Sequence, residues 1–456
     1  MESTIDNILD TLGQSSMFHL SLGSKELFHS NFLYWLSIID WDVFMAVMRG
    51  LAGNERFWWE DDYRHSNTPE DNSVEVRRES RNFDLSIYIR INKGDDRHQE
   101  GADEKGRNEI WVPVYILENK IKSLPRHEQL QEYVSKAFND WKRGKNKKQL
   151  RDLWQRQPIS FVLLSLYLPT DTNTLCNCCH KQDYTSRGKK EIVEFKCSWS
   201  AKNYGQLCDI LGNKSIQQPN SLDQQILKDY CHFIQALHEL TQTDWKLEST
   251  DDFVTKVSPW ALPNYKGDRV SKLRIDDIRQ KILYSQMQDM LEQKLKGAGI
   301  EAKHVSEDKK SSVWFATNFA HNIGILEVSI VFPKGKDCRL FIQLQGNSYS
   351  HAFFREKDAA KNLGMLKGKL ESFFEFDENV NTTENYPCSL NSKRLHPGGV
   401  NSRAKSKKFK NFKYYGDSFI YQNVLIPQGV SVEDVITAMV EDTKKCCDIV
   451  RQTKVI

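Results

Sequence analysis

No run of about 18 consecutive apolar residues, the length that indicates a membrane-spanning helix, occurs in this chain of 456 residues. The first residues, Met1–Asp6, also lack the basic and apolar regions of a secretory signal peptide. The net charge is only +3, so any attraction to nucleic acid must come from local basic patches rather than from a field over the whole molecule. These absences predict a cytoplasmic protein that does not bind membranes.

A regular zinc-binding motif is missing as well. The ten cysteines are expected to be reduced thiols, because a chain without a secretory signal does not usually form a disulfide framework. The densest group, Cys176-Asn-Cys-Cys-His180 with Cys197 downstream, offers soft ligands but lacks paired C-x-x-C knuckles. A cysteine-bearing surface loop is therefore the favoured interpretation, and a structural zinc at Cys176–His180 is the less favoured alternative.

The length and composition predict two domains. A chain of 456 residues exceeds what one hydrophobic core usually sustains, and a hydrophobic fraction of 39% can bury two cores. No internal repeat is present in the sequence. Prolines, a glycine and several charges between 246 and 272 are typical of an interdomain connection. The predicted organisation is a first domain at 1–245, a linker at 246–272 and a second domain at 273–456.

Hydrophobic periodicity predicts the elements of the first domain. We expect a helix at 25–39, strands at 74–79, 84–91 and 109–121, a helix from about 126 to 137 or beyond, and an apolar strand at 161–168. An irregular stretch holding the cysteines then leads to helices at 200–211 and 223–241. The order α-β-β-β-α-β favours an α/β core with a mixed sheet, because a strand-helix-strand step implies a parallel crossover.

The second domain is expected to be α+β. The pattern predicts helices at 274–296, 357–374 and 432–450, with short strands near 313–316, 323–332 and 340–344.

The most informative feature is Glu118-Asn119-Lys120, which closes an apolar strand, while Asp84 opens another. Side chains alternate along a strand, so Glu118 and Lys120 project from one face and Asn119 from the other. If the two strands form a hairpin, with 92–108 as the connecting loop, Asp84 lies near Glu118. Two carboxylates and a backbone carbonyl, assigned to Asn119, would suffice for Mg²⁺, and Lys120 beside them could order a water or balance charge on a phosphate.

These residues resemble the PD-(D/E)XK nuclease superfamily, whose members have a restriction endonuclease-like fold. The match lies in Asp84, in Glu118-Asn119-Lys120 and in the α-β-β-β-α-β order, and it covers about residues 1–241. It is especially close to a subset that carries the Glu-Asn-Lys form and begins with a Glu-Leu-Phe-His-Ser-Asn-Phe-Leu helix, here Glu26–Leu33. Phe83 replaces the proline that often precedes the aspartate in the superfamily.

The resemblance implies a role for each of these residues. Asp84 and Glu118 would bind Mg²⁺ or Mn²⁺, and Lys120 would position water or phosphate. Glu26 would support a metal directly or through water, although a glutamate in the first turn of a helix can simply compensate the helix dipole. Gln129 and Tyr133 resemble the Q-x-x-x-Y element of the RecB-like branch; four positions apart, they share a helix face.

Three further residues near these motifs have open roles. Glu79 could lie near the metal or phosphate, or form an ion pair with Arg77, Arg78 or Arg81. His29 is expected to be a helix-face residue rather than a ligand, and His127 is expected to flank the Gln129 helix.

Two basic stretches could contact nucleic acid. The first follows the Gln129 helix, and the second interleaves cations with aromatics as a surface that grips backbone and stacks bases would. Solvated loops are the alternative interpretation for both. The candidate residues are Lys142, Arg143, Lys145, Lys147 and Lys148 in the first stretch, and Arg403, Lys407, Lys408, Lys410 and Lys413 in the second.

The sequence therefore predicts a metal-dependent nuclease that acts on nucleic acid, with DNA favoured over RNA. The resemblance implies a link to bacterial defence against phage or foreign DNA. The alternatives are a catalytically silent nuclease-like protein that binds nucleic acid, and an effector activated by a partner through the second domain. A homodimer is also compatible with a nuclease, because cutting both strands of a duplex often needs two active sites.

Overall fold

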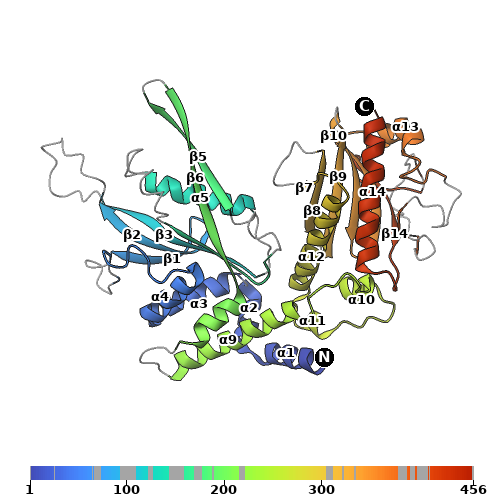
Figure 1. Cartoon of the computed structure of the whole chain (residues 1–456). Helices are drawn as coiled ribbons and strands as arrows, with labels where there is room; N and C mark the ends of the chain where they lie inside the picture. Colours follow the sequence, from blue (N-terminus) through green and yellow to red (C-terminus); the bar gives the residue numbers. More distant parts are fainter. Residues whose placement is uncertain are drawn as a thin grey trace. The chain divides into compact units, whose positions relative to one another are not determined.

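The computed structural model describes residues 2–24, 26–63, 65, 73–92, 109–121, 127–142, 159–168, 177–186, 189–214, 221–304, 312–320, 323–332, 335–377, 388–390, 396–397, 409 and 411–453. The chain is mixed α/β and divides into two compact units, Met1–Asp244 and Trp245–Ile456, each built around its own sheet (Figure 1). Within the described residues, no helix is long and apolar enough to cross a membrane.

The first unit begins with four helices and contains a six-stranded sheet. Its helices are α1 (Glu2–Gln14), α2 (Ser16–Ser24), α3 (Glu26–Ile39), α4 (Trp41–Ala52), α5 (His127–Lys142), α8 (Tyr204–Gly212) and α9 (Ser221–Gln242). Its strands are β1 (Val74–Ser80), β2 (Phe83–Asn92), β3 (Glu109–Lys120), β4 (Ser160–Ser165), β5 (Asn177–Ser186) and β6 (Lys189–Asn203).

The first sheet is mixed, in the strand order β1-β2-β3-β4-β6-β5. Strands β1, β2 and β3 pair antiparallel, and β4 pairs parallel with both β3 and β6. The chain passes from β3 through α5 to β4, so the predicted parallel crossover is confirmed. The strands β2 and β3 are apolar on both sides because both faces of the sheet are covered: α3 contacts β1, β2 and β3, and α5 contacts β3 and β5.

The turn between β1 and β2 has an unusual backbone. Ser80 pairs with Phe83, which leaves Arg81 and Asn82 as a two-residue turn with φ values of 58° and 69°. Two successive left-handed residues match the twist of a hairpin, and asparagine tolerates this conformation well. Glu79, just before the turn, is also left-handed, with φ 49°. This tight turn fixes the start of β2, where Asp84 lies.

Two predictions in this unit are wrong. The stretch with the cysteines is not a loop: β5 and β6 form a long antiparallel hairpin that extends beyond the other strands (Figure 1). Alternating apolar residues in β6, at Val193, Phe195, Cys197 and Trp199, are the signal for this strand. The following helix therefore begins at Tyr204 rather than at 200.

The second unit has an eight-stranded sheet in the order β12-β14-β11-β10-β9-β8-β7, with β13 beside β14. All pairs are antiparallel except β7 with β8. The strands are β7 (Lys303–His304), β8 (Val313–Ala320), β9 (Ile323–Phe332), β10 (Gly335–Gln345), β11 (Ser348–Arg355), β12 (His396–Pro397), β13 (Lys413–Tyr415) and β14 (Phe419–Leu425). The helices are α10 (Phe253–Val257), the 3-10 turn Pro259–Ala261, α11 (Arg269–Lys272), α12 (Asp276–Gly297), α13 (Ala359–Leu370) and α14 (Val432–Gln452).

The predicted linker is instead part of this unit. Phe253, Val254 and Val257 of α10 are buried in the same hydrophobic core as α12 and α14. The prolines and charges between 246 and 272 occupy turns around this short helix. Their composition is typical of an interdomain linker, but this segment is part of the second unit. Strands β11 and β14 were not predicted, because a buried histidine and glutamine interrupt their apolar alternation.

The long helices of the second unit pack on one face of its sheet. Helices α12 and α14 both contact β9, and Figure 1 shows them side by side along the strands. Leu326, Val328 and Ile330 of β9 and Leu340 and Ile342 of β10 are buried in the core with them. The intervening residues of β9 and β10 therefore point to the other face of the sheet.

Candidate active site

The start of β2 and the end of β3 bring the predicted carboxylates together. Leu85 pairs with Leu117 in the antiparallel register, so Asp84 and Glu118 occupy the next position at the same end of the hairpin. Asp84 Oδ2 accepts a hydrogen bond of 2.6 Å from the backbone N–H of Asn119. Burial raises the pKa of Asp84 to about 6, opposed by Asn119 and Lys120 and reinforced by the charges of Glu26 and Glu79.

Glu118 is almost fully buried, with 1% of its surface exposed. Its Oε1 accepts hydrogen bonds from the Lys120 ammonium and, at 2.8 Å, from Gln129 Nε2. Its Oε2 is also buried and has no hydrogen-bond partner among the described residues. Burial raises the pKa of Glu118 to about 8, the nearby charge of Asp84 raises it further, and Lys120 and the Tyr133 hydroxyl oppose both. This carboxylate is held in place but half satisfied.

Lys120 is the cation of the cluster. Burial alone would lower the pKa of its ammonium, but the negative charges of Glu118, Glu26 and Asp84 offset that effect, and the pKa is raised. The ammonium therefore stays charged and cannot act as a general base at neutral pH. Its chemistry is that of a fixed positive charge and hydrogen-bond donor.

Helix α5 covers the same face of β3. Gln129 Nε2 donates to Glu118 Oε1 and, at 2.7 Å, to the hydroxyl of Tyr133. Burial and the charge of Glu118 raise the pKa of Tyr133, so its hydroxyl stays protonated. The predicted Gln129 and Tyr133 thus lie at the site, where they fix the position of the Glu118 carboxylate.

Asn119 points to the opposite face and serves a different purpose. Its Nδ2 donates to the backbone carbonyl of Glu26 at 3.0 Å, and its Oδ1 accepts a hydrogen bond from the Tyr204 hydroxyl. Both polar groups of its side chain are therefore used to join β3 to α3 and α8, and only its backbone is left for the predicted metal role. Tyr204 was missed by the sequence reasoning, because no local pattern connects residues 85 positions apart.

The remaining acidic candidates lie near Asp84, whereas one histidine is a buried core residue and the other begins a helix. Glu26, in the first turn of α3, is close enough for its charge to raise the pKa of Asp84. Glu79 acts on Asp84 in the same way. His29 is fully buried, its Nδ1 lies 2.9 Å from the Tyr230 hydroxyl, and burial lowers its pKa to about 3. His29 is therefore a neutral core residue rather than a ligand, and His127 begins α5.

The arginines considered as partners of Glu79 each contact another group. Arg77 pairs with Glu75 at 2.6 Å, Arg78 donates to Asn31, and Arg81 pairs with the buried Asp140 of α5. The Arg81 contact joins the β1–β2 turn to α5. It therefore helps hold the start of β2 beside the helix that carries Gln129.

The donor set fits a hard divalent cation. Glu118 Oε2 is a buried oxygen without a partner among the described residues, and the pKa values of both carboxylates are raised. A cation beside them would relieve both effects. The described residues hold no group of three or more His, Cys, Asp or Glu that could enclose a metal by themselves. Mg²⁺ needs less, since it is usually bound by one or two carboxylates with water and phosphate oxygens.

Most of the predicted nucleic-acid contacts cannot be placed. Lys142 ends α5, and Arg143, Lys145, Lys147 and Lys148 lie outside the described residues, as do Arg403, Lys407, Lys408 and Lys410. Lys413 is described: it lies on β13, with its ammonium 5.9 Å from the centre of the Tyr421 ring. Cys176 also lies outside the described residues, while Cys178 and Cys197 face each other across the β5–β6 hairpin.

The fold and site together define a mixed α/β protein in which buried carboxylates and a lysine meet at the ends of two antiparallel strands. Comparison with protein-family models, with curated proteins and with solved structures found no match. The function is therefore argued from this site.

Proposed function

We propose that the protein is a metal-dependent nuclease that hydrolyses phosphodiester bonds in DNA, with its active site at Asp84, Glu118 and Lys120. The observation that carries the proposal is Glu118, a buried carboxylate with one oxygen held by Lys120 and Gln129 and the other without a partner among the described residues. A carboxylate that served only to stabilise the fold would be expected to have both oxygens satisfied.

The residues of this chain supply positioning and charge. Asp84 and Glu118 would hold Mg²⁺ or Mn²⁺, which when bound neutralises developing negative charge and lowers the pKa of a bound water. Gln129 keeps Glu118 Oε1 in place, so that Oε2 would be the oxygen that holds an ion. Lys120 presents a permanent positive charge to a phosphate oxygen or to the attacking water. Asn119, through its N–H, fixes Oδ2 of Asp84 and so orients the carboxylate that would hold the ion.

The restriction endonuclease-like core is part of the same proposal. Its support is the order α3-α4-β1-β2-β3-α5-β4 with a mixed sheet, the acidic residues at the start of β2 and the end of β3, and the Gln129–Tyr133 pair on the next helix. The predicted link to defence against phage or foreign DNA rests on the resemblance alone. So does the preference for DNA over RNA.

Cleavage of linear duplex, circular duplex and single-stranded DNA, with structured RNA alongside, tests the proposal. Each substrate is incubated with the parent protein in Mg²⁺, Mn²⁺ or EDTA, and with Asp84→Ala and Lys120→Ala in Mg²⁺. The expected result is cutting that needs the metal and is lost in both variants. Lys246→Ala is the matched control, because this exposed lysine pairs only with a nearby glutamate at the surface.

Two results would contradict the proposal. If Lys120→Ala cut as fast as the parent, the site assignment would be wrong. If the parent cut no substrate in either metal but still bound nucleic acid, the silent nuclease-like alternative would replace it, and partner activation would then be tested by adding cell extract to the parent and to Lys120→Ala.

A further inference from the structure

The face of the second sheet that α12 and α14 leave uncovered carries a band of aromatic side chains. Two rows run across the strands in register. The first row joins Tyr415, Phe419, Phe354, Arg339 and Val331. The second row joins Lys413, Tyr421, Ala352, Phe341, Ser329 and Trp314. We call these two rows the aromatic band.

The rings of the aromatic band contact one another, and the exposure rises toward the edge strand. Phe341 lies 6.4 Å from Phe354 and 5.8 Å from Phe419, centre to centre, in edge-to-face arrangements. Phe354, Phe419 and Tyr421 are partly exposed. Tyr415 on β13 is 81% exposed. A large ring held on a strand with most of its surface in water is a costly feature for a surface without a partner.

The charges within the two rows are positive, and Glu327, in the next row of the same face, offsets part of the Arg339 charge. The guanidinium of Arg339 lies over the Trp314 ring at 4.4 Å and near Phe354 at 5.8 Å, and Lys413 lies over Tyr421. The two rows contain these two cations and no acidic residue. Arg339 Nε is buried and has no hydrogen-bond partner among the described residues. Cations held on aromatic faces are suited to a ligand that combines flat rings with negative charge.

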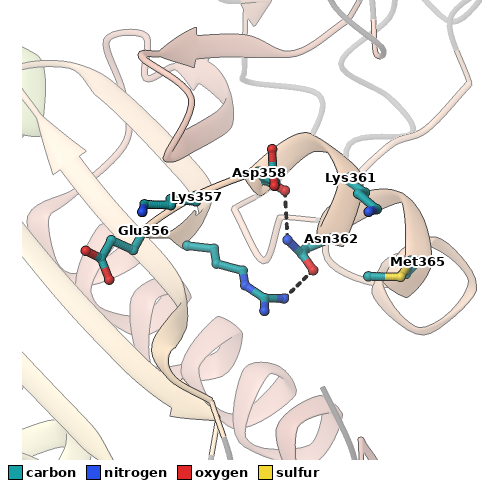
Figure 2. Close-up of a pocket in the computed structure, with 7 residues that line it drawn as sticks. Glu356, Lys357, Asp358, Lys361, Asn362 and Met365 are labelled. Carbon is teal, nitrogen blue, oxygen red and sulfur yellow. Dashed lines mark hydrogen bonds between the residues drawn. The ribbon is translucent and has the colours of Figure 1, made fainter.

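A basic pocket lies at the end of β11, on the helix side of the sheet, because Arg355 pairs with Cys338 of the hydrophobic core and Phe354 points to the other face. Its volume is about 460 Å³, and its lining includes Arg355, Lys357 and Lys361 against Glu356 and Asp358. Figure 2 shows Asp358, Lys361 and Asn362 along the start of α13, with Lys357 just before it. Asn362 orders the pocket wall, because its Nδ2 donates to the Asp358 carbonyl at 2.8 Å and its Oδ1 accepts from Arg355.

We propose that the aromatic band, and not the pocket on the other side of the sheet, binds single-stranded nucleic acid, with bases stacked on Tyr415, Phe419 and Phe354 and a backbone phosphate at Lys413. The inference rests on the proposed function in taking nucleic acid as the substrate, and it adds that the second unit grips an unpaired strand. Stacked bases need accessible ring faces, which a duplex does not offer to a flat sheet. The phosphate needs a cation beside those rings, and Lys413, two positions before Tyr415 on the same face of β13, supplies it.

Fluorescence anisotropy with labelled oligothymidylate, its DNA duplex and oligouridylate tests the inference. All measurements use the full chain in EDTA, so binding is read without cleavage. We expect the single strands to bind more tightly than the duplex, and whichever single strand binds more tightly identifies the substrate. Tyr415→Ala should weaken single-strand binding about tenfold, the loss of roughly one stacked base. Tyr415→Phe keeps the ring and should bind as the parent does.

The charge component has its own matched control. Lys413→Glu should weaken binding and reduce the slope of log affinity against log salt, because one phosphate contact is lost. Lys444→Glu makes the same change at an exposed position of α14, on the helix side of the sheet, and should leave affinity unchanged. Equal losses in the two lysine variants would contradict a localised site.

The inference is overturned if the duplex binds as tightly as the single strands, or if Tyr415→Ala binds as the parent does. It is also overturned if Tyr415→Ala changes the sedimentation of the protein from dimer to monomer, since the face would then contact a second copy. These outcomes are independent of cleavage. Binding through the aromatic band without cutting would reject the proposed nuclease alone, and cutting with unaltered binding by Tyr415→Ala would reject this inference alone.

Discussion

Two buried carboxylates, Glu118 in the first unit and Asp442 in the second, each bind a lysine but differ in how their oxygens are satisfied. Asp442 accepts from the Ser389 hydroxyl at 2.6 Å and from Lys445 at 3.1 Å through Oδ1. Its Oδ2 accepts from the Tyr349 hydroxyl at 2.8 Å and lies 2.9 Å from His351 Nε2. In Glu118, Lys120 and Gln129 both donate to Oε1, and Oε2 has no partner among the described residues.

The pKa values of the two carboxyl groups move in opposite directions. Burial would raise the pKa of Asp442, but His351, Ser389 and Lys445 more than offset it and hold the pKa well below its usual range. Burial dominates at Glu118 and raises its pKa to about 8. The fold has surrounded Asp442 with donors and has left Glu118 short of them, which is the pattern expected of a structural group and a functional group respectively.

The Asp442 cluster resembles a catalytic triad in composition only. The Ser389 hydroxyl bonds the Asp442 carboxylate rather than the imidazole, and the ring of His351 is fully buried against Phe373, with Nδ1 2.8 Å from the Phe373 carbonyl oxygen. A nucleophile needs its base within hydrogen-bond reach. This cluster instead joins α14 to β11 and to the segment 388–390.

The largest expected effect is the loss of cleavage in Glu118→Gln. If Glu118 holds the metal as proposed, its replacement should lower the rate of phosphodiester cleavage in Mg²⁺ roughly a thousandfold or more. In the metal-free protein at pH 7 the free energy of unfolding should change much less than in Asp442→Asn, because burial already opposes the charge of Glu118, and the amide oxygen of glutamine can still accept from Lys120 and Gln129. Chemical denaturation in EDTA measures the change in unfolding free energy, and a cleavage assay in Mg²⁺ measures the loss of activity. A large loss of stability with retained cutting would reverse the comparison.

Asp442→Asn should show the opposite behaviour. Breaking a buried, hydrogen-bonded charge pair costs about 3–5 kcal/mol of unfolding free energy. A lowered carboxyl pKa gives stability that is present above the unfolded pKa and is lost as the pH falls, so the difference between the parent and Asp442→Asn should shrink in acid. Denaturation at neutral and acidic pH measures this.

Asp448→Asn, on the same helix, is the control for that measurement. Asp448 and its partner Arg451 are 63% and 79% exposed, so the pair contributes little. If Asp448→Asn lowered the free energy of unfolding as much as Asp442→Asn does, the total charge of α14, rather than the buried network, would explain the loss of stability.

Asp84→Asn should stabilise the metal-free protein at high pH. The raised pKa of Asp84, about 6, means that its stabilising contribution is complete below the unfolded pKa and is lost as the pH rises through 6. In EDTA, the free energy of unfolding of the parent should therefore fall by on the order of 1–2 kcal/mol between pH 4 and pH 8. That of Asp84→Asn should not show this fall. Thermal unfolding across this pH range is the test, and parallel pH profiles of the two proteins would count against the burial of this charge.

The smallest expected effect is that of Gln129→Ala. This residue positions Glu118 rather than contacting substrate, so cleavage should fall roughly tenfold, with the larger part recovered at high metal concentration. Gln131→Ala, on the same helix, is the control. If added metal did not restore the cleavage rate of Gln129→Ala, the result would indicate that Gln129 contacts the substrate directly.

The local pattern of the chain was enough for the strands and the pairing at the site. An apolar run ending in Glu118-Asn119-Lys120 puts the first and third side chains on one face by alternation, and the structure confirms that Glu118 and Lys120 contact each other. The helix with Gln129 and Tyr133 was predictable for the same reason, because a spacing of four residues places both on one face. The hairpin β5–β6 was not predicted by the same reasoning, because charged residues lie between the alternating apolar residues of β6.

The sequence by itself determined the α-β-β-β-α-β order, the meeting of Asp84 with Glu118, and the basic-aromatic character of the segment that ends in Tyr415. These follow from periods of two and about four residues, which act over short distances along the chain. Tertiary structure alone decided the Tyr204–Asn119 bond, the donors around Asp442, the rows of the aromatic band and the unsatisfied oxygen of Glu118. Each depends on which distant segments pack together and on how much water they exclude, and burial sets the charge state of a carboxylate as much as its neighbours do.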